Sequence, residues 1–188
     1  KKIAILGSTG SIGKNLIEIL KKDKKNIKIL LLVANQNIKE LLKQALFFNV
    51  KNIIISDEKK FLQIKKILKY RKINIYNDFR SFNKIFSKDK IDYTMCAISG
   101  LVGLEPCLNI IKFTKRIAIA NKESIICGWP LISKKLKKHK VAFVPVDSEH
   151  FSIYSLLNKA TNEDVEKIYI TASGGPFHKL PLKNFNKI

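Results

Sequence analysis

The chain has 188 residues, 46% of them hydrophobic, and its 36 basic residues against 15 acidic ones give a net charge of +21. This composition excludes a disordered chain, and the lack of any run of about 18 uncharged apolar residues excludes a membrane-spanning helix. Only three basic residues are arginines, and lysines recur along nearly every expected helix, which favours solvated helix surfaces over a specific nucleic-acid interface.

The N-terminal segment and the cysteines bear on where the protein works. Residues 1–6 read as the start of a strand, in place of the charged and apolar regions of a signal peptide. Cys96, Cys107 and Cys127 lack the paired spacing of a zinc or redox motif and are expected to be free thiols. We therefore expect a cytoplasmic protein without a membrane partner, or a plastid protein if a transit segment has been removed.

Apolar runs that are typical of strands alternate with amphipathic stretches of helical period along the chain. Strands are expected over residues 2–6, 27–34, 50–56, 73–76, 91–98, 116–120 and 140–146, and again from residue 167. Helices are expected to start near Ser11, Ile38, Glu58 and Phe82, and to cover residues 103–113, 122–138 and 151–160. Strands that alternate with helices form βαβ units around a parallel sheet. The sequence therefore predicts an α/β fold with a Rossmann-like, doubly wound, mostly parallel sheet.

The first expected strand runs directly into GSTGSIG, residues 7–13. Glycines between a strand and a helix are the context in which such a turn binds a dinucleotide phosphate. Gly7 would allow the tight turn, Gly10 the close approach of a pyrophosphate, and Gly13 close packing of the helix on the strand. Hydroxyl donors would come from Ser8, Thr9 and Ser11. A tight turn without a ligand is the alternative, and phosphate binding is the favoured interpretation.

The end of the second expected strand bears on which dinucleotide binds. A site that prefers NAD carries a carboxylate about 20 residues after the glycine loop, which binds the ribose 2′-hydroxyl. Here the strand ends in VANQN, and Asn35, Gln36 and Asn37 offer amides with no carboxylate to repel a 2′-phosphate. No lysine or arginine follows until Lys39. The segment therefore predicts NADPH as the cofactor.

Polar residues also follow the sixth expected strand. Asn121, Lys122, Glu123 and Ser124 place an amide, a cation, an acid and a hydroxyl at one strand end, which suits a polar ligand. In the alternative interpretation they form a helix N-terminus, where Glu123 would complement the helix dipole. Both interpretations can hold together.

Two carboxylates follow the seventh expected strand in PVDSEH, residues 145–150. In an extended chain Asp147 and Glu149 would project from the same face and repel each other unless a cation or a proton joined them. This pairing indicates a metal site. The alternative is that both acids are solvated at the strand end or lie in the first turn of the following helix.

Five motifs occur in order along the chain: GSTGSIG, AISGLVGLEP, ANKES, PVDSEH and SGGPF. Together they resemble the 1-deoxy-D-xylulose 5-phosphate reductoisomerase family over essentially the whole chain. The resemblance implies an NADPH-dependent oxidoreductase and isomerase that requires Mg²⁺, Mn²⁺ or Co²⁺. Such an enzyme converts 1-deoxy-D-xylulose 5-phosphate, a phosphorylated sugar, to 2-C-methyl-D-erythritol 4-phosphate in non-mevalonate isoprenoid biosynthesis. It also implies a homodimer for the full-length enzyme.

The resemblance further implies roles for individual residues. The residues implied to bind NADPH are Gly7, Thr9, Gly10, Ser11, Ile12, Gly13, Asn35, Gln36, Asn37, Asn121 and Glu123. Asp147 and Glu149 would bind the metal, and Lys122 and Glu149 would be catalytic. The residues implied to bind substrate are Lys122, Ser148, Glu149 and Ser173.

The chain departs from the family pattern in three ways, one of which is Phe151 where the family typically has Asn. The family usually has Gly-Lys-Asn where this chain has Asn35, Gln36 and Asn37, which weakens the expected lysine contact to the 2′-phosphate.

Residues 1–146 are expected to form the NADPH-binding domain and residues 147–188 the beginning of the catalytic domain. The resemblance places a third metal carboxylate beyond these residues, so we expect an N-terminal portion that is inactive alone.

Two other functions remain open from the sequence. Another NAD(P)-dependent dehydrogenase, of the semialdehyde or homoserine type, would explain the glycine loop and leave NKES and DSEH unexplained. A basic nucleic-acid-binding module would show strongly salt-dependent binding to DNA or RNA.

Overall fold

The structure is a computed structural model, which describes residues 1–67, 73–87, 90–157, 164–170, 181 and 184. Its contacts divide the chain into two units, Lys1–Val146 and Asp147–Ile188, and each is described by itself. Among the described residues, no helix is both long enough and apolar enough to cross a membrane.

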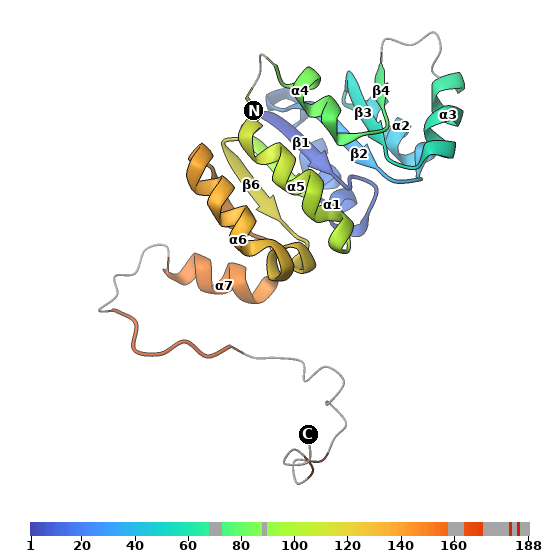
Figure 1. Ribbon diagram of the computed structural model, residues 1–188. Coiled ribbons are helices and arrows are strands. Elements are labelled where there is room, and N and C mark those ends of the chain that lie inside the picture. Colours follow the sequence, from blue (N-terminus) through green and yellow to red (C-terminus); the bar gives the residue numbers. More distant parts are fainter. Residues whose placement is uncertain (68–72, 88–89, 158–163, 171–180, 182–183, 185–188) are drawn as a thin grey trace. The chain divides into compact units, whose positions relative to one another are not determined.

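The first unit is built on a seven-stranded sheet in the order β4-β3-β2-β1-β5-β6-β7, in which neighbouring strands are parallel (Figure 1). Its strands are β1 Lys2–Leu6, β2 Lys28–Ala34, β3 Asn52–Ile55, β4 Asn74–Tyr76, β5 Tyr93–Cys96, β6 Arg116–Ile119 and β7 Ala142–Pro145. This sheet confirms the predicted Rossmann-like, doubly wound α/β fold. The strand order reverses between β1 and β5, so the loops after these two strands flank the crevice where such sheets bind ligands.

The helices of the first unit begin where the sequence predicts. They are α1 Ser11–Lys21, α2 Ile38–Phe47, α3 Glu58–Ile67, α4 Phe82–Ile85, α5 Leu104–Ile110 and α6 Lys122–His139. Short 3₁₀ turns are η1 Lys24–Asn26, η2 Phe79–Ser81, η3 Leu101–Gly103 and η4 Ile111–Phe113. Asn37 and Asp57 cap α2 and α3, because their side chains accept backbone N–H groups three residues further along.

Helices cover both faces of the sheet. This is required because successive residues of a strand point to opposite faces, and apolar residues of β1 lie on both. In β1, Ala4 and Leu6 belong to one hydrophobic cluster, together with buried residues of α4, α5 and α6. Ile3 and Ile5, which point the other way, belong to a second cluster with buried residues of α1, α2 and α3. The core thus has two layers, and Figure 1 shows α5 and α6 on the same side of the sheet.

The second unit contains one described helix, α7 Ser148–Leu157. It begins three residues before the helix that the sequence predicts over 151–160. The strand predicted from residue 167 is wrong over residues 167–170, because these residues have no strand partner among the described residues and Tyr169 is 84% exposed. The remainder of that predicted strand lies outside the described residues.

Candidate functional site

The loop between β1 and α1 has a backbone that requires glycine at its first position. Gly7 has a φ angle of +83°, in the left-handed region that L side chains rarely adopt. A Cβ atom there would lie 2.5 Å from the carbonyl oxygen of Ala97, just after β5. The N–H groups of Gly7 and Ser8 donate to the carbonyl oxygen of Val33 in β2, at 3.0 and 2.9 Å. The loop is therefore held between the ends of both strands that neighbour β1.

Gly13 and Gly10 serve different purposes. A Cβ atom on Gly13 would overlap the carbonyl oxygen of Gly7 and lie 2.7 Å from the Cα atom of Ser8. The close contact at Gly13 is therefore with the loop, whereas packing on the strand was predicted. Gly10 is exposed, and a Cβ atom there would lie 3.4 Å from the carbonyl oxygen of Gly7, which is ordinary contact. Packing within the described chain does not require glycine at position 10.

The N-terminus of α1 can accept an anion. Gly10 is the N-cap residue, and its missing side chain cannot cap the helix; the first turn holds no acidic residue. Backbone N–H groups of a first helical turn have no intrahelical partner and form the positive end of the helix dipole. Ser11 and Ile12 are exposed and Thr9 is half-buried. Ser8 is fully buried, so the prediction that its hydroxyl adds a donor for a ligand is wrong.

Two of the amide residues after β2 have partners within the chain. The side chain of Asn37 accepts a hydrogen bond from the backbone N–H of Glu40 at 3.1 Å. Oδ1 of Asn35 accepts one from the hydroxyl of Ser56 at 3.2 Å. Both asparagines are exposed. The bonds fix their orientation and leave Nδ2 of each with no partner among the described residues.

The structure brings a carboxylate to this segment that the sequence analysis missed. Nε2 of Gln36 donates a hydrogen bond of 2.9 Å to Oδ2 of Asp57, which follows β3. Residues 35–37 themselves offer no carboxylate, as the sequence indicates, and Asp57 brings one to them from the neighbouring strand. A sequence signal for it existed, because strands that follow each other along the chain commonly lie side by side, and Asp57 directly precedes the expected start of α3.

Asn121 joins the loops that follow β5 and β6. Its Nδ2 atom donates hydrogen bonds of 2.6 Å to the carbonyl oxygens of both Ile98 and Gly100. Its Oδ1 atom accepts a bond from the backbone N–H of Ser124 at 3.0 Å, which caps α6. The side chain is buried, at 5% exposure. Its predicted contact with a cofactor stays a prediction, and the structure adds this role in joining the loops.

Lys122 and Glu123 lie in the first turn of α6 and are both exposed. The helix-start interpretation of this segment is confirmed, and Glu123 lies where a negative charge complements the helix dipole. Ser124 is fully buried, and its hydroxyl has no hydrogen-bond partner among the described residues. The predicted roles of Lys122 and Glu123 stay predictions.

The predicted cofactor residues all lie at one edge of the sheet. They follow three strands, β2, β1 and β6, at their carboxyl ends, and β5 lies between β1 and β6 in the sheet. Parallel sheets of this kind bind ligands at that edge, beside the point where the strand order reverses. The fold thus brings together residues that are up to 116 positions apart, from Gly7 to Glu123.

In the second unit, the extended geometry expected for Asp147 and Glu149 is wrong, and the alternative, in which these acids lie at the start of the following helix, is confirmed. Strand β7 already ends at Pro145, and Glu149 lies in the first turn of α7. Oδ1 of Asp147 accepts a hydrogen bond of 3.0 Å from the backbone N–H of His150 and lies 2.7 Å from the ring Nδ1 of His150. The backbone bond first, and then the ring, lower the pKa of Asp147 below its ordinary 3.8. Ser148 is exposed beside them.

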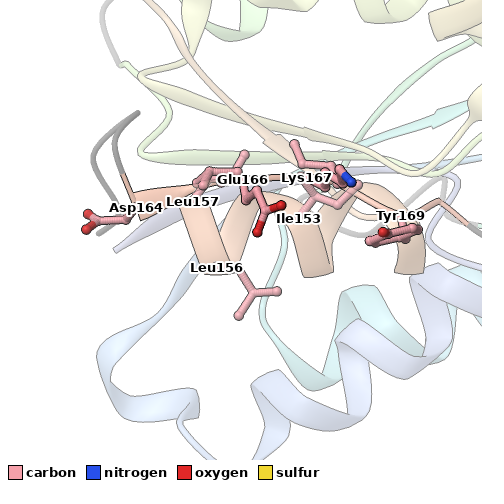
Figure 2. A pocket seen from close by; sticks show the side chains of 9 residues that line it. Ile153, Leu156, Leu157, Asp164, Glu166, Lys167 and Tyr169 are labelled. Atoms are coloured by element: carbon pink, nitrogen blue, oxygen red, sulfur yellow. The ribbon is translucent and has the colours of Figure 1, made fainter.

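Ser173, predicted to bind substrate, lies outside the described residues, as does the SGGPF motif. A groove of about 540 Å³ is found within the second unit, between α7 and residues 164–169 (Figure 2). Apolar side chains such as Ile153 and Leu156 line much of it, and none of the predicted site residues that the structure describes is among its lining residues.

A parallel sheet with a glycine loop at its switch point defines a dinucleotide-binding α/β protein. The family model described as 1-deoxy-D-xylulose 5-phosphate reductoisomerase matches residues 3–128, and the model of its C-terminal domain matches residues 143–188. The chain belongs to the 1-deoxy-D-xylulose 5-phosphate reductoisomerase family. This assignment decides against the semialdehyde and homoserine dehydrogenase alternatives.

Similar proteins agree with this assignment. The chain is 63% identical over its whole length to 1-deoxy-D-xylulose 5-phosphate reductoisomerase of Pelagibacter ubique, and covers 49% of that protein. It is 41% identical to the enzyme of Wolbachia pipientis, of which it covers 48%. The enzyme from Zymomonas mobilis, solved in complex with NADPH, superposes with a TM-score of 0.82 at 30% identity, over 98% of this chain and 48% of that one.

A further solved reductoisomerase holds NADPH, fosmidomycin and magnesium together. It matches with a TM-score of 0.82 at 29% identity, over 100% of this chain and 49% of that one. The chain therefore spans about half the length of the relatives that it matches.

Proposed function

We propose that this chain is the NADPH-binding part, with the beginning of the catalytic part, of a 1-deoxy-D-xylulose 5-phosphate reductoisomerase. Such an enzyme rearranges the carbon skeleton of its substrate to an aldehyde and reduces that aldehyde to 2-C-methyl-D-erythritol 4-phosphate. The observation that carries the proposal is the glycine loop at the switch point of the sheet, in a chain that is 63% identical to such an enzyme over its whole length.

The residues at the edge of the sheet fit a dinucleotide. The N-terminus of α1 has no side-chain cap at Gly10 and no acid in its first turn, so it favours a phosphate. Exposed amides at residues 35–37 would bind the adenosine end. Asn121 and Glu123, after β6, would lie toward the nicotinamide half. When bound, NADPH supplies the hydride of the reduction.

The residues after β7 fit a hard divalent cation in part. Asp147 and Glu149 provide carboxylate oxygens, the ligands that Mg²⁺ and Mn²⁺ prefer. The bond to His150 holds Asp147 in one orientation. The described residues contain no cluster of three or more metal-binding side chains, so these two carboxylates would need further ligands from elsewhere. A bound Mg²⁺, Mn²⁺ or Co²⁺ would stabilise negative charge on the substrate oxygens.

Side chains of this chain would act on the substrate as follows. Lys122 would place a positive charge beside the oxygens on which charge develops. Ser148 and Glu149 would bind the substrate beside the metal, and Ser173 would bind its phosphate. The substrate is a small phosphorylated sugar. The longer enzyme would be a homodimer in the cytoplasm, or in a plastid, with no specific nucleic-acid or membrane partner.

The test is a titration of the chain with NADPH and, separately, with NADH, followed by heat or by the fluorescence of Trp129. We expect tighter binding of NADPH that persists from near-physiological to about 0.5 M salt. Equal weak binding of both, lost at high salt, would mean that the +21 charge alone attracts anions, and would contradict the proposal.

A second measurement tests the catalytic part of the proposal. Because the described residues hold the two carboxylates proposed to bind the metal and no larger cluster, we expect this chain to bind NADPH without turning it over. The measurement is NADPH absorbance after addition of 1-deoxy-D-xylulose 5-phosphate and Mg²⁺. If this chain oxidises NADPH when the substrate is added, it is catalytically active by itself, and the expectation that it binds NADPH without turnover is contradicted.

A further inference from the structure

The loops that follow β2 and β3 are joined by their backbones. The N–H of Ser56 donates to the carbonyl oxygen of Ala34 at 3.1 Å, and that of Asp57 donates to the carbonyl oxygen of Asn35 at 3.3 Å. These bonds continue the parallel pairing of Ala34 with Ile55 beyond the strand ends. Side chains after β3 are therefore held beside the segment that would receive the adenosine end of NADPH.

The carboxylate of Asp57 is bound through both oxygens. Oδ1 accepts a hydrogen bond of 2.8 Å from the backbone N–H of Lys60, and Oδ2 accepts one of 2.9 Å from Nε2 of Gln36. The bond from Lys60, followed by that from Gln36, lowers the pKa of Asp57 below its ordinary 3.8. Asp57 is therefore ionised at neutral pH. Lys59 and Lys60 lie near enough to offset part of its charge.

We propose that Asp57 reduces the preference of this site for NADPH over NADH. Its carboxylate accepts a hydrogen bond from the amide of Gln36 and places a negative charge beside the ribose 2′ position. The inference rests on the proposed function. In dinucleotide-binding folds the ribose 2′ group meets the residues that end β2. A carboxylate repels a 2′-phosphate and accepts a hydrogen bond from a 2′-hydroxyl. Here the carboxylate comes from the neighbouring strand.

Asp57 also caps α3, and the test must separate the two roles. Asp57→Asn keeps the cap, because asparagine caps helices about as well as aspartate, and it removes the charge. We expect the Kd of NADPH to fall roughly three- to ten-fold. This is the size of effect expected when a negative charge several ångströms from the 2′-phosphate is removed and water and salt partly screen the repulsion. The Kd of NADH should stay constant or rise.

Asp23→Asn is the matched control. Asp23 lies beyond the C-terminal end of α1, at the end opposite the glycine loop, and its side chain accepts a bond from Asn26. This variant makes the same change in net charge, and we expect the ratio of the two Kd values to stay constant. A shift equal to that of Asp57→Asn would show a general charge effect and would overturn the inference.

Gln36→Met is a second variant that leaves the cap of α3 intact and removes the amide that partly neutralises Asp57. We expect the Kd of NADPH to rise about two- to three-fold more than that of NADH. If Gln36→Met and Asp57→Asn each leave both Kd values unchanged, or change both by the same factor, the inference is overturned and the proposed function still stands. Failure of the unaltered chain to bind either nucleotide would overturn the proposed function, and the inference with it.

Discussion

The side-chain amide of Asn121 donates a hydrogen bond of 2.6 Å to the carbonyl oxygen of Ile98, and so joins the loops after β6 and β5. The same amide nitrogen also donates to the carbonyl oxygen of Gly100, and the amide oxygen accepts the backbone N–H of Ser124 and so caps α6. Because the amide is buried and its bonds to the two carbonyl groups are partly buried, loss of the amide would leave those groups only partly able to bind water instead. The residue predicted to bind cofactor is thus also part of the frame that shapes the site.

Asn121→Ala is expected to lower the free energy of unfolding by about 2–4 kcal/mol, because it removes the partner of the carbonyl groups of Ile98 and Gly100 and removes a helix cap. Urea unfolding measures this loss. Asn15→Ala, at an exposed position of α1, is the control and should change stability by about 0.5 kcal/mol or less. An Asn121→Ala variant with unchanged stability would contradict the structural role.

Gly7→Ala is expected to destabilise the protein by about 3 kcal/mol or more. The added Cβ atom would meet the backbone of Ala97 at 2.5 Å, in a conformation with positive φ. Gly100→Ala is a matched control, because Gly100 has a φ of +76° and a Cβ atom there would meet no described atom within 4 Å. It should cost only about 1–2 kcal/mol. Equal losses in thermal unfolding would show that φ alone, and not the contact with Ala97, requires glycine.

Gly10→Ala separates binding from folding. A Cβ atom at position 10 would lie 3.4 Å from the nearest described atom, so stability should change by less than about 1 kcal/mol. A pyrophosphate on the N-terminus of α1 would meet that methyl group, and we expect the Kd of NADPH to rise at least about ten-fold. Thermal unfolding and NADPH titration of the same sample measure both. Retained affinity would show that the phosphate does not approach Gly10.

Asp92 should make stability depend on pH in acid. Nζ of Lys115 first, and then the backbone N–H of Lys2, lower the pKa of Asp92 from 3.8 to about 2. Because the folded-state pKa is the lower one, this stabilisation is complete above pH 3.8 and is lost as the pH falls toward 2.

Asp92→Asn should therefore lower Tm by no more than a few degrees at pH 7, with a difference that shrinks below pH 3.8. Measurement of Tm against pH for both proteins tests this. A difference that stays constant down to pH 2 would mean that the Asp92 charge does not stabilise the fold.

The sequence predicted the fold well where local signals decide it. Helices α2 and α3 begin at Ile38 and Glu58 because Asn37 and Asp57 precede them, and such caps are legible in the sequence. The parallel sheet follows from the alternation of buried strands with helices.

What the sequence did not reveal depends on contacts between distant segments. Asp57 was not assigned to the end of β2, because its bond to Gln36 arises only when β3 pairs with β2. The burial of Ser8 likewise follows from the way the loop packs. Glu149 was expected in an extended segment, and the cap that Asp147 provides starts α7 there instead.

The carbonyl oxygen of Val33 accepts both the N–H of Gly7 and that of Ser8, and Gly13 packs on the same stretch of backbone. One additional residue between Gly7 and Gly13 would break either the hydrogen bonds of Gly7 and Ser8 to β2 or the packing of Gly13, in α1, on the loop backbone. Changes of amino acid at Thr9 or Ser11 disturb neither attachment. For folding alone, residues 9 and 11 can therefore change while the length of the loop must stay the same.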